Sequence, residues 1–186
     1  MTANAVDVFR LLGDKHFDMI IFSASLEHMN HSERLDAMKQ AWEMLPSGGF
    51  MCVIEAPNRL WYADLHTSLL PFYHWIPDDL AFEYSKFSPR KSFRNISQQK
   101  TPDAFSDFLR HGRGVSFHEF DLAIKKSEKL RVTSSLHGFL RQKSVLYRLA
   151  WLLTKEGRYE KFLASVGPCI HGGFYEQFLN LIIQKD

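Results

Sequence analysis

FDMIIFSASLEH (residues 17–28) and MLPSGGFMCVIE (residues 44–55) decide the fold of this chain of 186 residues. Residues 17–23 and 50–55 are short, mostly apolar runs, as expected of parallel strands that are covered on both faces. A helix between them completes a βαβ unit, for which a right-handed crossover is strongly preferred. Because open α/β sheets bind ligands beyond the carboxyl ends of their strands, the polar residues after the first strand predict a binding site.

The helix between the two strands has readable ends. Asn30 precedes it and Glu33 follows three residues later, which is the spacing of a capping box. Pro46 and Gly48-Gly49 end it. Residues at helical spacing predict a side that faces the core and a side that faces solvent. The first set is Leu35, Met38, Trp42 and Leu45, and the second is Glu33, Arg34, Asp36, Lys39, Gln40 and Glu43.

The composition favours one domain over residues 1–186 in a reducing compartment. Apolar residues make up 45% of the chain, enough for a core, and a net charge of +2 does not indicate nucleic-acid binding. Two cysteines are too few for a disulfide framework, and Cys52 lies in an apolar run that predicts a core position. No signal peptide and no apolar run of about 20 residues is present, so we expect a cytoplasmic protein without a transmembrane segment.

An aromatic-rich segment follows the second strand. It is too aromatic for a disordered linker and too long for an ordinary connection, so we interpret residues 58–114 as an insertion or lid. Within it, Thr101 and Pro102 have the pattern of a helix start. Beyond it we expect a strand, a basic amphipathic helix and a last strand, over residues 115–123, 143–156 and 174–184 respectively.

The first two stretches resemble the second half of a class I S-adenosylmethionine-dependent methyltransferase. The resemblance rests on Phe17-Asp18, on the elbow Leu26-Glu27-His28 and on the turn Leu45-Pro46-Ser47-Gly48-Gly49, and it is specific over residues 17–59. It implies an α/β fold with a partial Rossmann-like sheet and helices on its faces. In the family order 3-2-1-4-5-7-6, the strands present would be the group 4-5-7-6, with the seventh antiparallel.

The same resemblance implies S-adenosylmethionine as the cofactor. The backbone of Ser23, Ala24, Ser25 and Leu26 would contact it. Only 16 residues precede Phe17, too few for the family's first three strands and its glycine-rich cofactor loop. Gly112-Arg113-Gly114 and Gly172-Gly173 precede predicted strands, whereas a cofactor loop follows a strand and opens a helix. We therefore expect weak or no cofactor binding by this chain, which could be inactive as a truncated form.

Glu27 and His28 are the candidate catalytic residues. Methyl transfer to oxygen or nitrogen needs alignment and a general base, and an imidazole suits that role near neutral pH. The alternative is that His28 packs against the elbow or caps the next helix. A metal site is not predicted, because the spacing of His28, His31, His66 and His74 matches no metal-binding pattern.

We expect Asn58, Arg59, His66 and Trp75 to bind a small or medium-sized acceptor, because they follow the second strand and lie on the expected catalytic rim. Arg59 could hold a carboxylate or phosphate in a bidentate contact. It could equally brace the loop by pairing with Asp64 or Glu55. The aromatic residues around Trp75 could line an apolar acceptor pocket or fill the core of the insertion.

A second class of function is open. The chain could be a non-catalytic methyltransferase-like remnant, or a protein-interaction module that exposes the edge of its first strand. A dimer or a partner chain would then cover that edge. The helix at residues 143–156 could lie on an anionic membrane, but its modest charge favours a solvated surface helix.

Overall fold

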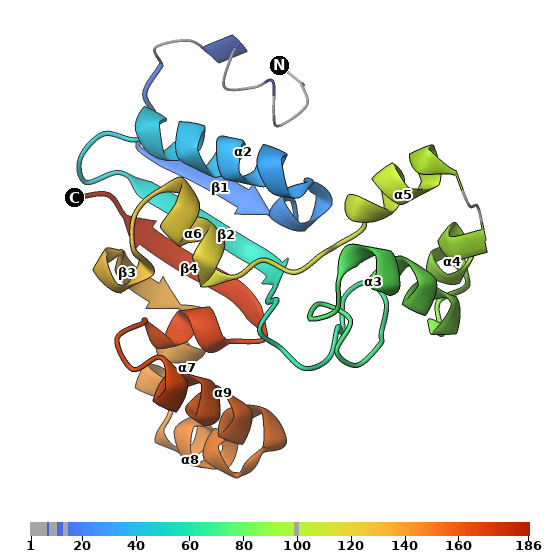
Figure 1. The fold of residues 1–186 in the computed structure, drawn as a ribbon. Helices are drawn as coiled ribbons and strands as arrows, with labels where there is room; N and C mark the ends of the chain where they lie inside the picture. Colours follow the sequence, from blue (N-terminus) through green and yellow to red (C-terminus); the bar gives the residue numbers. More distant parts are fainter. Residues whose placement is uncertain (1–6, 8–10, 13–14, 99–100) are drawn as a thin grey trace.

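The computed structural model describes residues 7, 11–12, 15–98 and 101–186, and Figure 1 shows their mixed α/β fold. A four-stranded sheet occupies the centre, with two helices on one face and two further groups of helices that both connect to the end of the sheet at which its parallel strands finish. The strands are β1 (Met19–Ser23), β2 (Phe50–Pro57), β3 (Arg131–Ser135) and β4 (Phe178–Gln184).

The first half of the sheet is the expected βαβ unit. β1 and β2 pair in parallel, and α2 (His31–Met44) connects them. The capping box is present, because the Glu33 N–H donates to Asn30 Oδ1 and the Asn30 N–H donates to Glu33 Oε2, both at 3.0 Å. Gly48 has a φ of +84°, a left-handed conformation that explains glycine in this turn.

The strand order is β1-β2-β4-β3, with β4 antiparallel to both of its neighbours. This is the order and direction that the resemblance implies for the group 4-5-7-6. One strand was assigned to the wrong residues, since β3 is Arg131–Ser135 and residues 117–123 form α6 (Phe117–Ala123). The cause is a second capping box, in which Ser116 and Glu119 start a helix that the apolar alternation concealed.

One face of the sheet carries the core. α2 and α6 cover it, with Met38 of α2 and Phe120 of α6 both fully buried. The predicted polar side of α2 was wrong at Arg34, which is 3% exposed on the buried side of the helix. Strand residues that point into this core alternate along the sequence, as a pleated sheet requires. They include Phe22, Met51, Val53, Leu179, Leu181 and Ile183.

The other face is largely open among the described residues, so the expectation of helices on both faces is met on one face only. Met19, Ile21, Ile54 and Ile182 are exposed there. α7 (Leu136–Lys143) adjoins this face beside β3. Cys52 is buried, as predicted, but it lies on this second face and lines a pocket with Leu136 and Phe139, outside the main core cluster.

The aromatic segment after β2 forms a lobe of short helices with its own apolar cluster. Tyr73, Phe82, Phe93 and Phe108 pack there largely edge to face, which favours the interpretation that most of these aromatics fill a core. Thr101 caps the last helix through the Ala104 N–H, as its sequence predicted. The elements are α3 (Asp78–Tyr84), η2 (Ser85–Phe87), α4 (Lys91–Arg94), η3 (Ile96–Gln98) and α5 (Pro102–Leu109).

A third group of helices lies between β3 and β4. The single helix expected over residues 143–156 was wrong, because α8 (Val145–Leu153) ends at Thr154, which caps α9 (Lys155–Val166). The last strand starts four residues later than expected, after η5 (Gly172–Tyr175). Within the described part of the chain, no helix has the length and apolar character needed to cross a membrane.

Candidate functional site at the strand ends

The backbone turns sharply where β1 ends. Ala24 has a φ of 42°, in the left-handed region that residues with a side chain seldom adopt, and its N–H donates to Ile54 O at 2.9 Å. Ser25 Oγ is buried without a hydrogen-bond partner among the described residues. Leu26 is fully buried in the core and starts η1 (Leu26–His28). The elbow is therefore strained and holds an unsatisfied polar atom, two features that cluster at functional sites.

Glu27 is the most unusual residue of the elbow. Its side chain is 0% exposed, and within the described chain neither carboxylate oxygen accepts a hydrogen bond from another residue. Burial raises the pKa of the Glu27 carboxyl above its ordinary value, and the nearby His28, His66 and Arg34 only partly oppose this. A titratable group whose pKa is shifted by burial at the end of a strand is a candidate functional residue.

Two histidines from different parts of the chain lie beside Glu27. His28 Nε2 is 3.9 Å from Glu27 Oε1, while its Nδ1 lies 3.0 Å from Arg110 O. Because a carbonyl can only accept, Nδ1 carries the proton and Nε2 of the neutral ring has a free lone pair. The His66 ring comes from the loop after β2 and lies 6.5 Å from that of His28. The structure thus brings together two predicted catalytic residues and one predicted acceptor-binding residue.

Arg34 fixes the position of this elbow. Its guanidinium donates to Leu26 O at 2.7 Å, to Met29 O at 3.3 Å and to Glu119 Oε1 at 2.5 Å. It also donates to the carbonyls of Arg113 and Gly114, at 3.1 and 3.2 Å. The planar, five-donor geometry of arginine allows one side chain to join η1, α6 and the segment that returns from the aromatic lobe.

That returning segment, residues 112–115, crosses the ends of β1 and β2. The Gly112 N–H donates to Glu27 O at 3.1 Å, and Val115 exchanges backbone hydrogen bonds with Pro57 and Arg59, both at 2.8 Å. A Cβ at Gly114 would lie 2.8 Å from Arg59 Cα, so only glycine fits. The segment therefore runs between His66-Thr67 on one side and Arg59 on the other.

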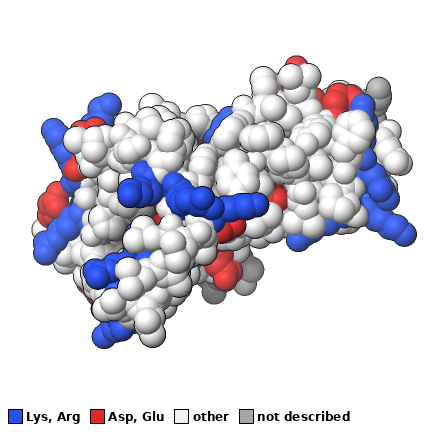
Figure 2. Space-filling view, turned by 90° about the horizontal axis from the view of Figure 1, so that it is seen from below, with Lys and Arg blue, Asp and Glu red and all other residues white. Residues whose placement is uncertain are grey.

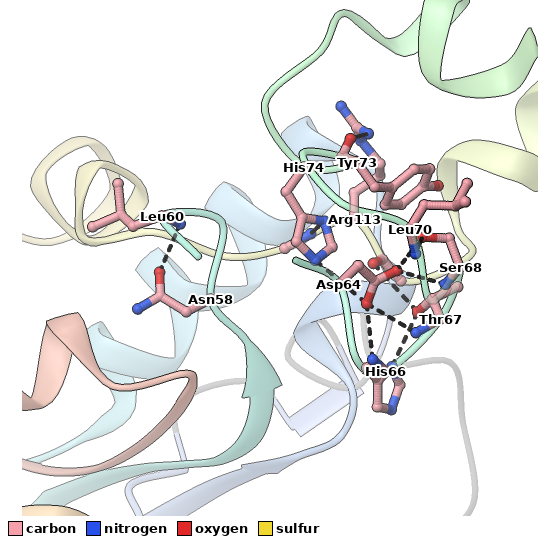
Figure 3. Close-up of polar contacts among 12 residues, drawn as sticks. Asn58, Leu60, Asp64, His66, Thr67, Ser68, Leu70, Tyr73, His74 and Arg113 are labelled. Atoms are coloured by element: carbon pink, nitrogen blue, oxygen red, sulfur yellow. Dashed lines mark hydrogen bonds and ion pairs between the residues drawn. The ribbon is translucent and has the colours of Figure 1, made fainter. Parts of the chain in front are cut away.

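Asp64 organises the loop after β2 (Figure 3). Its carboxylate accepts from the His66 and Thr67 N–H groups at 2.9 Å, from the Ser68 N–H at 2.5 Å and from Ser68 Oγ at 2.7 Å. His74 Nε2 is 3.5 Å away. Burial alone would raise the pKa of Asp64, but the contacts with His74, Ser68 and Thr67 outweigh it and hold the pKa well below its ordinary value.

His74 is a structural partner of Asp64. Its Nδ1 accepts from the Gly114 N–H at 3.1 Å, which leaves the proton on Nε2, toward Asp64. Burial lowers the pKa of His74 despite the opposing effect of Asp64, so the ring is neutral at neutral pH. Beside it, Arg113 donates to the carbonyls of Tyr73 and Ile76 at 2.6 and 2.7 Å. Figure 3 shows His74 beside the Asp64 carboxylate and Arg113 next to Tyr73.

The Asn58 side chain also has a structural role, because it forms hydrogen bonds with the backbone of two segments. Its Nδ2 donates to Phe174 O and Glu176 O, both at 2.7 Å, and its Oδ1 accepts from the Leu60 N–H at 2.9 Å. It is 1% exposed. These bonds tie the chain just after β2 to η5 and the segment that leads into β4, and they leave the amide little capacity for a ligand.

Arg59 and Trp75 line a separate cleft of about 520 Å³. Neither Asp64 nor Glu55 forms an ion pair with Arg59 among the described residues, so the side chain is not engaged in the bracing role considered for it. Glu119 lies in the cleft wall, 3.6 Å from His31 Nδ1. The walls also carry apolar surface from the loop after β2, from α6 and from α9, and the lining residues include Leu60, Leu122, Tyr159 and Leu163.

The predicted site residues therefore fall into three places. Glu27, His28 and His66 gather at the elbow with Ser23, Ala24, Ser25 and Leu26, Arg59 and Trp75 line the cleft, and Asn58 braces the sheet. Arg34, Glu119 and Asp64 were missed as organisers. Only Glu119 had a usable signal, the Ser116-x-x-Glu119 spacing of a capping box.

No group of three or more histidine, cysteine, aspartate or glutamate side chains in the described ranges is arranged to hold a metal ion. Comparisons with protein-family models and with curated protein sequences find no match for this chain.

Proposed function

We propose that this chain forms the acceptor-side half of an S-adenosylmethionine-dependent methyltransferase. The observation that carries the proposal is the sheet order β1-β2-β4-β3 with β4 antiparallel, together with the buried, unpaired Glu27 carboxylate where β1 ends. A single antiparallel strand placed between two parallel ones is a specific topology, and the elbow sequence Leu26-Glu27-His28 falls at the strand end where α/β sheets bind ligands.

The elbow fits a cofactor of this kind in part. Ser25 Oγ and the Glu27 oxygens are buried polar atoms that form no hydrogen bond with another described residue, and a ligand could satisfy them. S-adenosylmethionine, when bound, supplies a methyl group on a positively charged sulfur. The described residues contain no glycine-rich turn that follows a strand and opens a helix, so the expected affinity of this chain alone is weak.

The proposed chemistry of the chain itself is proton transfer. A hydroxyl or amine of the acceptor would give its proton to His28 Nε2, whose lone pair is free and whose side chain is 54% exposed. Glu27, at 3.9 Å, would stabilise the imidazolium that forms. His66 would orient the acceptor from the opposite side, and the cleft of Arg59 and Trp75 would hold the rest of the molecule.

The test is an NMR titration of the isotopically labelled chain with S-adenosylhomocysteine, with inosine as the control ligand. We expect backbone amide shifts over residues 23–28 at millimolar concentration, and none with inosine. Shifts confined to other segments, or equal responses to both ligands, would contradict the proposal.

A protein-interaction module is the second candidate, and the open sheet face favours it. Met19, Ile21, Ile54 and Ile182 form exposed apolar surface across β1, β2 and β4, and the outer edge of β1 pairs with no other strand in the described part of the chain. Light scattering that shows a clean monomer, without binding of a dye that reports exposed apolar surface, would count against this candidate.

A further inference from the structure

Helix α8 has its apolar side turned outward. Val145, Leu146, Leu149, Leu152 and Leu153 follow the i, i+1, i+4, i+7, i+8 spacing that places side chains on one face of a helix. All five are exposed, and Leu146 and Leu153 are each 80% exposed. A surface helix of a globular protein normally buries such a face, so this orientation requires an explanation.

Polar and aromatic contacts on the opposite side fix this orientation. The Trp151 ring packs edge-on against His137 at 4.5 Å, and its Nε1 donates to Glu160 Oε2 at 3.0 Å. Glu160 is buried and also accepts from His137 at 2.7 Å and from Arg141. Because the side of α8 that carries Trp151 is bonded to the protein, the opposite side with Val145 and the four leucines is held toward solvent.

Positive charge surrounds the leucine face. Residues 136–170 contain six lysines or arginines and two glutamates, and one of these glutamates is the buried Glu160. In Figure 2 the molecule is seen from the side on which α8 and α9 lie, and their white surface is edged with blue side chains. No ion pair within the described ranges engages the exposed basic residues of this region, which are Lys143, Arg148, Lys155, Arg158 and Lys161.

We propose that α8 lies in the surface of an anionic lipid bilayer, with its leucines among the acyl chains and the basic residues at the headgroups. An outward apolar stripe edged by lysine and arginine is the arrangement of an interfacial helix, and anionic lipid supplies the complementary charge. A second copy of the chain fits less well, because a symmetric contact would bring two basic faces together. The inference does not depend on methyl transfer.

The test is co-sedimentation of the full chain with vesicles of phosphatidylcholine and phosphatidylglycerol, compared with vesicles of phosphatidylcholine alone. We expect the chain to sediment with the anionic vesicles only. The double variant Leu146→Glu/Leu153→Glu should lower its partitioning about tenfold or more, since it places charge in the acyl region. Lys155→Gln/Lys161→Gln should lower it severalfold and weaken its dependence on salt.

The matched control is Leu65→Glu/Leu80→Glu, which adds the same charge at exposed leucines outside α8, 57% and 56% exposed. Circular dichroism checks that each variant is folded. The proposal is overturned if the unaltered chain stays in the supernatant, if it binds neutral vesicles equally well, or if the control loses as much binding as the α8 variant. A dimer that the α8 variant converts to a monomer, without vesicle binding, would assign this face to a second copy instead.

Discussion

Two buried carboxylates lie close to the ends of β1 and β2, and they differ in their hydrogen bonds and in the direction of their pKa shifts. Asp64 is 1% exposed and accepts four hydrogen bonds from its own loop, besides its contact with His74. Glu27 is 0% exposed and accepts none from another described residue. The pKa is lowered at Asp64 and raised at Glu27. The two carboxylates are equally buried, but they differ in hydrogen bonding. The charge of Asp64 therefore stabilises its loop, whereas the charge of Glu27 opposes folding, and Glu27 is the better functional candidate.

The largest expected effect comes from the arginine that holds the Glu27 elbow. Arg34→Met removes five hydrogen bonds and leaves the buried Glu119 without its cation. We expect the free energy of unfolding to fall by about 3–5 kcal/mol in urea denaturation. The double variant Arg34→Met/Glu119→Leu should recover part of this loss, because it removes the stranded charge. A fall of less than about 1 kcal/mol in the single variant would show that Arg34 does not organise the elbow.

The second-largest loss of stability is expected when the Asp64 carboxylate is removed. Asp64→Ala leaves the N–H groups of His66, Thr67 and Ser68 without an acceptor, and we expect a loss of about 3 kcal/mol in the same assay. Because the pKa of Asp64 is lowered on folding, this contribution is present above its ordinary value of 3.8 and disappears as pH falls through the folded value. Asp36→Ala, at an exposed position of α2, should change little at any pH.

Glu27 should respond in the opposite direction. Folding raises the pKa of its carboxyl, so the folded state is disfavoured as pH rises above the ordinary value of 4.5. Glu27→Gln should therefore be more stable than the unaltered chain at pH 8, by on the order of 1 kcal/mol, and the gain should vanish below pH 4.5. Glu43→Gln, on the exposed side of α2, is the control. A loss of stability in Glu27→Gln at pH 8 would mean that Glu27 is a structural residue like Asp64.

The smallest effect on stability is expected at His28. Its side chain is half exposed and makes one hydrogen bond, to Arg110 O, so His28→Ala should change the free energy of unfolding by about 0.5 kcal/mol or less. The same variant should raise the pKa of Glu27 further, because His28 is one of the groups that lower it. An unchanged Glu27 titration would show that the two side chains are not coupled and would weaken the proposed proton transfer.

Local signals predicted the first half of the sheet well. Each of these signals involves only residues that are a few positions apart: the apolar run at residues 17–23, the apolar run at 50–55, and the spacing of Asn30 and Glu33. The structure confirms all three. At residues 117–123 two local signals conflicted. Apolar alternation predicted a strand, but the Ser116 capping box and packing against α2 produced a helix.

The site depended on partners far apart in sequence. Arg34 meets Glu119 across 85 positions, and no local pattern reveals that such a charge is buried. His66 reaches His28 only because Asp64 folds the loop after β2 back over the strand ends. The outward face of α8 was also not predictable, since its spacing is the same whether leucines face a core or solvent.

The contrast between the two carboxylates can be measured in one experiment. An NMR titration that follows the side-chain carboxyl carbons would give the titration midpoints of Glu27 and Asp64 in the same folded chain. The predicted result is a midpoint above 4.5 for Glu27 and below 3.8 for Asp64. A midpoint for Glu27 at or below 4.5 would mean that this carboxylate is solvated or paired, and would contradict its assignment as the functional group of the elbow.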